Sequence, residues 1–456
     1  MNRWVWPGVV VGVVAIGTVS ATLVGAQPVP QAPFAASETR VSVVCPSFQS
    51  PTADVRVAVA AVGPGLRTSP VANPNGGSDA SGFRVLDAPG TSLRVSALLP
   101  DPFGGSTAVS AEVGSDRGLS ASACAAPSTD HWFTGVDVRD VAQSDIIVAN
   151  LDGTRASVDL TVYGDKGKVA APRGIEVDGN SLQTISLRTL DRSPAPLTVE
   201  VSSGDGRVAA FIRQRTWAGT TPLGADWLAE TTAPATDLVV PGIPSGSGQR
   251  TLVVTNPGDL TASVSIGTMM KSGAGEVAGA NQLEVPPGTT RTIDLALGLD
   301  GQAGALRLSS TEPVTAGVWL DTGGGDASHD PAYTVATRPL PADSLWPLAM
   351  GKGATTVLQL ANPGSADATA TVTAGTGTAA GQPKEVTVPA GSAVQVALGQ
   401  GATNLVRVQT AATDLRGALV STARLGKIHG LAVVDLAADD THSGEAPVVF
   451  DPHAGS

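Results

Sequence analysis

Short runs of alternating apolar and polar residues cover most of the chain, and turns rich in Gly and Pro separate them. Ala262, Val264 and Ile266, for example, alternate with small residues, as in a strand with one buried face. In this region the pattern predicts seven strands, over residues 238–242, 250–256, 262–268, 281–285, 290–297, 305–310 and 314–320. Seven short strands are typical of an immunoglobulin-like or fibronectin-like β-sandwich, so the predicted fold class is all-β.

The end of one predicted strand recurs at a fixed interval. Asn150, Asn256 and Asn362 each close an apolar run, and each step between them is 106 residues. In the second and third copies Asn is followed by Pro-Gly, which stops a strand and favours a tight turn. We interpret the three residues as turn asparagines that cap their own backbone, rather than as ligand-binding groups.

A second turn follows each Asn by some 26 to 29 residues and marks the same repeat. It begins at Val177, Val285 and Val388, and a related stretch at 85–92 indicates a fourth, more divergent copy. A period of this length fits tandem sandwich modules that each have their own core and follow one another in a row. The predicted boundaries are 1–27 for an N-terminal segment, 28–128 for the divergent module, and 129–232, 233–340 and 341–456 for repeats 1 to 3, the last with a polar tail.

A β-propeller is the alternative architecture, because each repeat can be divided into two four-stranded blades. No blade signature recurs at half the period, which favours sandwiches. The stretches 214–237 and 320–344 are too long for tight hairpins. They are expected either to add an edge strand around Trp227 and Tyr333 or to form joints between domains.

The N-terminus predicts a membrane segment. Residues 4–26 are 23 uncharged residues, which as a helix would extend about 34 Å and cross a hydrocarbon core of about 30 Å. Arg3 precedes the segment, so the positive-inside rule places the remainder outside the cytoplasm. A single-pass anchor in the cytoplasmic membrane is expected; a signal peptide cleaved after Ala26, which would release a secreted protein, is the alternative.

Composition narrows the function classes. The chain of 456 residues contains 54 Gly and 33 Pro and is only 15% charged, against roughly 25% in an ordinary domain. Its formal charge is −12, without a basic stripe that would neutralise phosphates, so nucleic-acid binding is disfavoured. The two cysteines, Cys45 and Cys124, lie in the exported part and are expected to form a disulfide. Closing that loop would stabilise the fold by up to about 4.5 kcal/mol.

Motifs for catalysis or metal binding are absent from the sequence, so no catalytic residue, cofactor or metal site is predicted. The densest acidic loop contains Asp321, Asp326 and Asp330, but its spacing does not match a calcium motif. The pairs Asp130-His131 and His329-Asp330 lack an identifiable nucleophile.

Aromatic residues are scarce. Trp217, Trp227 and Tyr333, in the long stretches between repeats, form a candidate ligand platform, although packing in the core or at an interface is the simpler interpretation.

The order of these features resembles a known family. An N-terminal apolar helix, a first cysteine in VVCPS, a second in SACAAPSTDHWFTG and tandem Asn-Pro-Gly turns are similar to membrane-anchored exported proteins of high-GC Gram-positive bacteria (actinobacteria), catalogued as a domain of unknown function. The resemblance implies a location in the cell envelope and supplies no catalytic residues.

We therefore expect a non-enzymatic, membrane-anchored extracytoplasmic scaffold or protein-interaction protein. Its expected partner is an envelope protein or a cell-wall polymer, and binding of cell-wall glycan is the alternative function.

Overall fold

The computed structural model describes residues 40–436 apart from 140, 191–194, 278, 296–298, 323–327, 352, 376–380 and 401–403. These described residues form one compact unit. Its regular structure is antiparallel β-strand with one short 3-10 helix, which confirms the all-β prediction. The membrane segment predicted at 4–26 lies outside these residues, and within them no helix is long and apolar enough to cross a membrane.

The strands fall into four successive groups, here called modules 1 to 4. Module 1 contains β1 (Arg40–Cys45), β2 (Asp54–Ala61), β3 (Leu66–Pro70), β4 (Ser78–Ala80), β5 (Phe83–Asp87), β6 (Leu93–Leu98), β7 (Phe103–Ala111) and β8 (Gly118–Ala123). Module 2 contains β9 (Asp130–Val136), β10 (Ala142–Asn150), β11 (Ala156–Gly164), β12 (Gly167–Val169), β13 (Ile175–Val177), β14 (Ser181–Ser186), the 3-10 helix η1 (Leu187–Thr189), β15 (Leu197–Asp205), β16 (Val208–Ala218) and β17 (Thr221–Leu228).

The other two modules repeat this plan. Module 3 contains β18 (Ala235–Ile243), β19 (Arg250–Asn256), β20 (Ala262–Met270), β21 (Gly273–Glu276), β22 (Gln282–Val285), β23 (Thr289–Asp294), β24 (Gly304–Asp321) and β25 (Pro331–Val335). Module 4 contains β26 (Asp343–Leu348), β27 (Thr355–Asn362), β28 (Ala368–Gly375), β29 (Lys384–Val388), β30 (Ser392–Gln400), β31 (Asn404–Thr410), β32 (Arg416–Leu425) and β33 (Ile428–Asp435).

Each module forms two sheets with the same strand order. If the strand positions of a module are lettered a to h, one sheet has the order a-f-c-d and the other has the order e-b-g-h. Two short strands fill position d in modules 2 and 3, and in module 3 the single strand β24 occupies positions f and g and joins the two sheets. In an immunoglobulin domain the first two strands are neighbours in one sheet, whereas here strands a and b belong to different sheets. The immunoglobulin-like order is therefore not confirmed.

The core of a module lies between its two sheets, although it is not isolated from its neighbours. In module 2, Val158 and Leu160 from one sheet pack with Ile146 and Ile212 from the other, all of them buried. The core of module 3 also includes Val420 and three further apolar residues of module 4. The expectation of modules that each have a separate core is therefore wrong, because neighbouring modules share apolar contacts.

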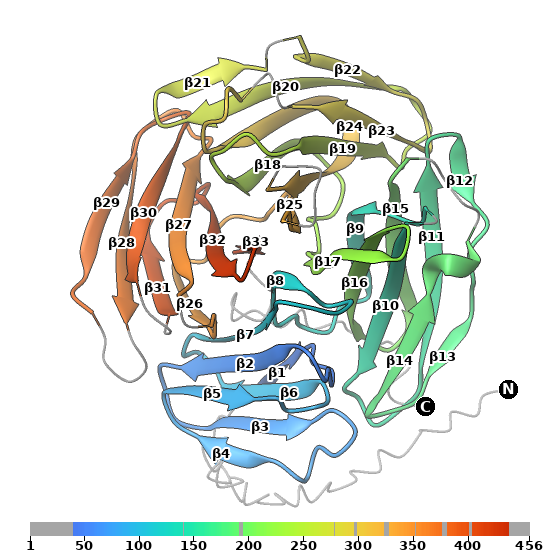
Figure 1. The fold of residues 1–456 in the computed structure, drawn as a ribbon, viewed down its shortest axis with the longest axis vertical. Helices are drawn as coiled ribbons and strands as arrows, with labels where there is room; N and C mark the ends of the chain where they lie inside the picture. The colour runs from blue at the N-terminus through green and yellow to red at the C-terminus, as the bar shows by residue number, and fades with distance from the viewer. Residues whose placement is uncertain are drawn as a thin grey trace, which may run out of the picture. The chain divides into compact units, whose positions relative to one another are not determined.

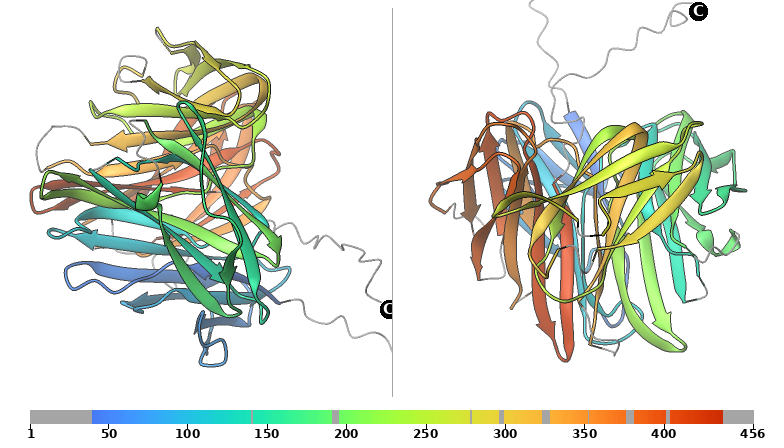
Figure 2. Two further views of the ribbon diagram at one scale, coloured as in Figure 1. Left: turned by 90° about the vertical axis from the view of Figure 1, so that its right-hand side faces the viewer. Right: turned by 90° about the horizontal axis from the view of Figure 1, so that it is seen from above.

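The eight sheets of the described chain stand around a common centre (Figure 1). Their h strands, β8, β17, β25 and β33, are innermost and pack against one another in a closed cycle. Module 1, in blue, meets module 4, in orange and red, so the ring closes; seen from above, the strands run from top to bottom (Figure 2, right). This differs from the expected row of modules. The long stretches around Trp227 and Tyr333 form the central edge strands β17 and β25 rather than joints.

A single carboxylate joins three modules at the centre. Asp330 of module 3 is fully buried, and its Oδ2 accepts hydrogen bonds from the backbone N–H groups of Leu119 in module 1, at 2.7 Å, and Leu431 in module 4, at 2.9 Å. The approach requires Gly118, which has a φ of 105° and whose added Cβ would lie 1.9 Å from Asp330 Oδ1.

Different buried polar contacts join each neighbouring pair of modules. Modules 1 and 2 are linked by an ion pair between Asp116 and Arg213, 3.0 Å apart, and modules 2 and 3 by a hydrogen bond between the Thr198 and Thr255 hydroxyls, at 2.7 Å. Gln359 of module 4 bonds to the backbone of module 3 at Gly242 and Ile243. These contacts fix the angle between modules, because each would leave a buried polar group unsatisfied if the modules moved apart.

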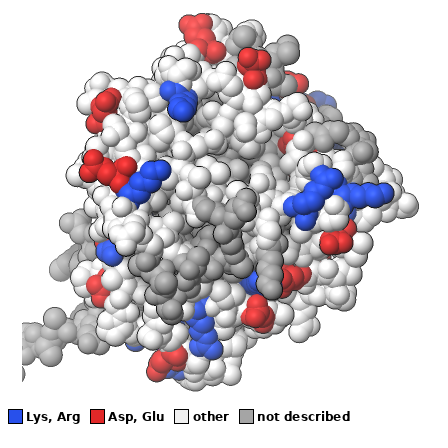
Figure 3. Space-filling model, turned by 60° about the vertical axis from the view of Figure 1, so that its left-hand side comes forward, with Lys and Arg blue, Asp and Glu red and all other residues white. Residues whose placement is uncertain are grey.

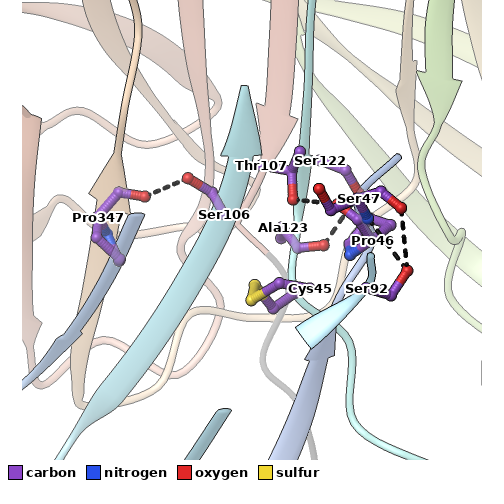
Figure 4. The surroundings of a disulfide bond; sticks show 10 residues. Cys45, Pro46, Ser47, Ser92, Ser106, Thr107, Ser122, Ala123 and Pro347 are labelled. Atoms are coloured by element: carbon purple, nitrogen blue, oxygen red, sulfur yellow. Dashed lines mark hydrogen bonds between the residues drawn. A yellow bond between two sulfur atoms is a disulfide. The ribbon is translucent and has the colours of Figure 1, made fainter. Parts of the chain in front are cut away.

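The disulfide predicted between Cys45 and Cys124 is present. It joins the last residue of β1 to the residue after β8 and so fastens the two sheets of module 1 to each other. Close to it, the hydroxyl of Ser106 donates a hydrogen bond to the carbonyl of Pro347, which links module 1 to module 4 (Figure 4). The covalent bond therefore lies beside the place where the ring closes.

The three repeat asparagines end strand b of modules 2, 3 and 4 and are buried. The side-chain amide of Asn256 donates to the carbonyls of Leu260, at 2.6 Å, and Val285, at 2.9 Å, and its oxygen accepts from the N–H of Gly258, at 3.0 Å. Asn150 and Asn362 make the same three bonds at their own turns. Each Asn thus caps its own turn and also holds the valine that begins the second sequence landmark.

We expect Asn256→Ala to lower the free energy of unfolding by about 2–4 kcal/mol, because it leaves two buried carbonyls and one N–H without a partner. Urea unfolding of the purified protein measures this loss. Asn256→Asp should lose stability too, since a carboxylate cannot donate to the two carbonyls. The control is Asn75→Ala at an exposed position; equal losses at 75 and 256 would contradict the structural role of Asn256.

Candidate functional site

A pocket of about 380 Å³ opens between modules 3 and 4. In module 3 its walls are the loop between β18 and β19 and the end of β24; in module 4 they are the region around Thr355 and the hairpin of β32 and β33. Leu320 and Leu431 supply apolar surface, and most of the other lining groups are polar. A concave site with a few convergent polar groups is the usual form of a ligand pocket.

Arg250 is a buried residue that supports one wall of this pocket. It begins β19, is 3% exposed, and donates hydrogen bonds to the carbonyls of Gly248 at 2.9 Å, Pro244 at 2.9 Å and Gly246 at 2.7 Å. The loop between β18 and β19 therefore folds around a guanidinium. Burial lowers the pKa of Arg250 from its usual value.

Arg424 lies at the exposed rim on the opposite wall. It is the cross-strand neighbour of His429 in the hairpin, and its guanidinium donates to the imidazole ring. Thr355 and Thr422 face each other on β27 and β32 and bring two exposed hydroxyls to the same wall. A basic group with hydroxyl donors beside it can bind an anionic or hydroxylated ligand.

The acidic loop of the sequence is divided between two environments. Asp321 lines the pocket and lies 2.8 Å from the Nδ1 of His329. Asp330 instead points into the centre of the ring, where burial raises its pKa well above the usual value although two backbone N–H groups oppose the shift. Asp326 lies outside the described residues. Where the structure describes the chain, no three His, Cys, Asp or Glu side chains converge on a metal site.

The pair Asp130-His131 is structural. The His131 ring is 1% exposed; its Nδ1 lies 2.9 Å from Glu230 and its Nε2 2.6 Å from the carbonyl of Val208. Burial works against the charged ring, but Glu230 and the carbonyl outweigh it, so the pKa of His131 is raised. Both ring nitrogens therefore have partners inside the fold.

The aromatic platform suggested by the sequence does not form. Trp227 is 2% exposed and Tyr333 is 3% exposed, and only Trp217 is partly accessible. Trp227 packs beside Phe211, with ring centroids 6.4 Å apart, and Tyr333 lies in the core of module 2. Their apolar strands place both rings inside the ring of modules, where they cannot present a surface to a ligand.

Arg213, like His131, is a buried charged residue with a structural role. Its guanidinium lies 4.3 Å from the Phe48 ring and 4.9 Å from the Trp227 ring and pairs with Asp116. Burial lowers the pKa of Arg213 to about 10. Burial alone would raise the pKa of Asp116, but the guanidinium groups of Arg213 and Arg215 hold it below its usual value. Through its Nη2 contact with Asp116 this cation joins modules 1 and 2.

Asp435 at the end of β33 competes with a backbone carbonyl for one hydroxyl group. The Thr334 hydroxyl lies between two acceptors, the carbonyl of Pro241 and the Oδ1 of Asp435, at 2.8 Å from the latter, yet it has one proton. The Oδ2 of Asp435 accepts from the N–H of Val335 at 3.1 Å, and a proton on Oδ1 would let Asp435 donate to Thr334 Oγ1 while that hydroxyl donates to Pro241. In agreement, burial raises the pKa of Asp435 to about 7, against the opposing effect of these hydrogen bonds.

The fold and pocket define a class, namely an all-β protein of repeated antiparallel sheets with a polar pocket between two modules. The chain belongs to a family of unknown function (DUF5719), whose model matches residues 94–399, or 306 of the 456 residues. No curated protein matches the chain.

Sequence reasoning singled out Asp321 but missed the two arginines of the pocket. Arg250 and Arg424 are 174 positions apart and belong to no local motif. One signal in the sequence pointed to Arg250. At the equivalent position of the neighbouring repeats stand Ser144 and Thr356, so a charged residue replaces a small polar one there.

We expect Asp435→Asn to reduce the pH dependence of stability. Because the folded-state pKa of Asp435 lies above the unfolded value of about 3.9, its favourable contribution is complete below about pH 4 and is lost as pH rises toward 7. Wild type should therefore lose roughly 2–4 kcal/mol more stability than the variant between pH 4 and 7.5. Urea unfolding at a series of pH values measures this.

Asp259→Asn, at an exposed position, is the matched control and should follow wild type. If the free energy of unfolding of wild type and of Asp435→Asn changed in parallel with pH, ionisation of Asp435 would not destabilise the fold and the prediction would be wrong.

Proposed function

We propose that the chain is a non-enzymatic, membrane-anchored extracytoplasmic scaffold or protein-interaction protein. The observation that carries the proposal is the closed ring, in which buried contacts between modules fix eight sheets around one centre. A body of this kind holds its outer strands and hairpins at constant distances, which is what a scaffold requires. Acidic and basic side chains are interspersed on the face shown in Figure 3, which suits contact with proteins better than with a polyanion.

Export is supported by the disulfide and by the N-terminal sequence. A disulfide between buried cysteines persists in an oxidising compartment and is rare in the cytosol. The apolar residues 4–26 supply the proposed anchor, with residues beyond 27 outside the cytoplasm.

We further propose that the fold is a β-propeller whose eight blades are interleaved in pairs. One blade of each pair uses strand positions a, f, c and d of a module, and the other uses e, b, g and h. Such blades cannot repeat at half the sequence period, which accounts for the missing blade signature. The pairings of the second strand with the fifth and the third with the sixth also occur in immunoglobulin domains, so the modules are related to sandwiches in their central strands.

Between the two functions considered from the sequence, protein interaction is the better supported. The alternative of glycan binding rested on Trp217, Trp227 and Tyr333, and two of these rings are buried. Among the described residues that line the pocket between modules 3 and 4 there is His429 but no Trp, Tyr or Phe, so the pocket lacks the large aromatic surface on which a sugar usually stacks.

Thiol labelling in cells tests export. We expect Cys45 and Cys124 to resist a maleimide reagent when cells are quenched with acid and the protein is denatured, and to react after reduction, because oxidised sulfur has no free thiolate. Gel mobility with a polymer-linked maleimide counts the thiols. Cys45→Ser is the control, since its remaining cysteine should react without reduction; labelling of both wild-type cysteines before reduction would place the protein in a reducing compartment.

Photo-crosslinking in the native envelope tests protein interaction. A crosslinking amino acid at Thr184 on β14 or Thr387 on β29, both exposed on outer edge strands, should give discrete protein adducts on a denaturing gel. The buried position Thr198 is the control and should give none. Absence of adducts from all outer edge strands would count against the interaction role and favour a spacer without partners.

A further inference from the structure

We propose that the pocket between modules 3 and 4 binds an oxyanion, namely the carboxylate or phosphate group of a small ligand. The inference goes beyond the scaffold role and does not depend on it, because it rests on the pocket's own charges and hydrogen-bond donors.

The charge of the pocket opposes that of the whole chain. The protein has a formal charge of −12, yet the pocket is lined by two arginines, Arg250 and Arg424, and by one carboxylate, Asp321. That carboxylate already faces His329 at 2.8 Å. The pocket therefore has an excess of positive charge in a concave site, an arrangement that concentrates anions.

Arg250 lacks a counter-charge within the described part of the chain. Its three hydrogen-bond acceptors are all backbone carbonyls, no carboxylate lies at ion-pair distance, and its buried Nε–H has no acceptor. Buried charges in proteins are normally paired with an opposite charge. An anion in the pocket would supply that charge to a guanidinium which otherwise only supports the wall.

Arg424 and two hydroxyls provide direct donors at the open side. The hydrogen-bond partner of Arg424 is the imidazole ring of His429, and a ring nitrogen is a weaker acceptor for a guanidinium than an oxyanion. Thr355 and Thr422, opposite each other on neighbouring strands, can each donate one O–H. A planar guanidinium with adjacent hydroxyls matches the oxygens of a carboxylate or phosphate, whereas a cation would be repelled by the two arginines.

Calorimetric titration of the full-length protein with inorganic phosphate and, separately, with succinate tests the proposal. We expect saturable binding of at least one probe, and Arg424→Gln should weaken it by about tenfold to a hundredfold. Arg424→Lys should recover part of the affinity because the charge remains. Since Arg424 is exposed, its replacement should leave the thermal unfolding midpoint unchanged.

Arg84→Gln, at an exposed position in module 1, is the matched control and should bind like wild type. Binding of phosphate alone identifies a phosphate-bearing ligand, and binding of succinate alone identifies a carboxylate-bearing one. Absence of saturation by both probes at millimolar concentration, or equal loss in Arg84→Gln and Arg424→Gln, would overturn the proposal. Export and protein crosslinking, measured separately, would not be affected by that result.

Discussion

The ring depends on how four short strands meet at its centre. β8, β17, β25 and β33 pack against one another without continuous sheet pairing between modules, so their backbone polar groups need other partners. One oxygen of Asp330 is the partner of two of these groups, because it accepts hydrogen bonds from one backbone N–H in module 1 and one in module 4. The bond is possible because Gly118 leaves room for the carboxyl group. Burial raises the pKa values of Asp330 and Asp226 well above their usual range, which means that ionising either carboxyl group in the fold costs free energy. The same buried groups fix how the modules meet, so the centre gains a specific geometry at an electrostatic cost.

Local turn chemistry and distant packing are joined at the same residues. Asn150, Asn256 and Asn362 end strand b and hold the valine that ends strand d, so one side chain links the two sheets of a module. The repeat that is visible in the sequence is therefore a repeat of sheet-to-sheet connections. Because strands a and b lie in different sheets, each module is completed only when its whole length has folded.

The fold class, many strand positions and the disulfide could be predicted, since alternation, turn residues and cysteine number are local or compositional signals. The ring could not. β25 (Pro331–Val335) is short, wholly buried and without alternation, and so has no clear strand pattern. Asp330 looks like a loop acid in the sequence, because its partners are 211 and 101 residues away. Packing was the simpler interpretation of Trp227, but its neighbours could not be predicted, because Phe48 and Arg213 come from two different modules.

Positions that differ between repeats carry the distinctive chemistry of this chain. At the start of strand b, module 2 has Ser144, which bonds to Gln214 at 2.9 Å, and module 4 has Thr356, which bonds to Ser421 at 2.8 Å. At the same place module 3 has Arg250, whose size and charge are accommodated by folding a loop around it. In modules 2 and 4 the two neutral side chains of each pair are hydrogen-bonded to each other. In module 3 the guanidinium of Arg250 is bonded to carbonyls alone, so its charge is unbalanced beside the pocket. The repeated residues therefore build the modules, and the exception at one junction is where specificity for a ligand can arise.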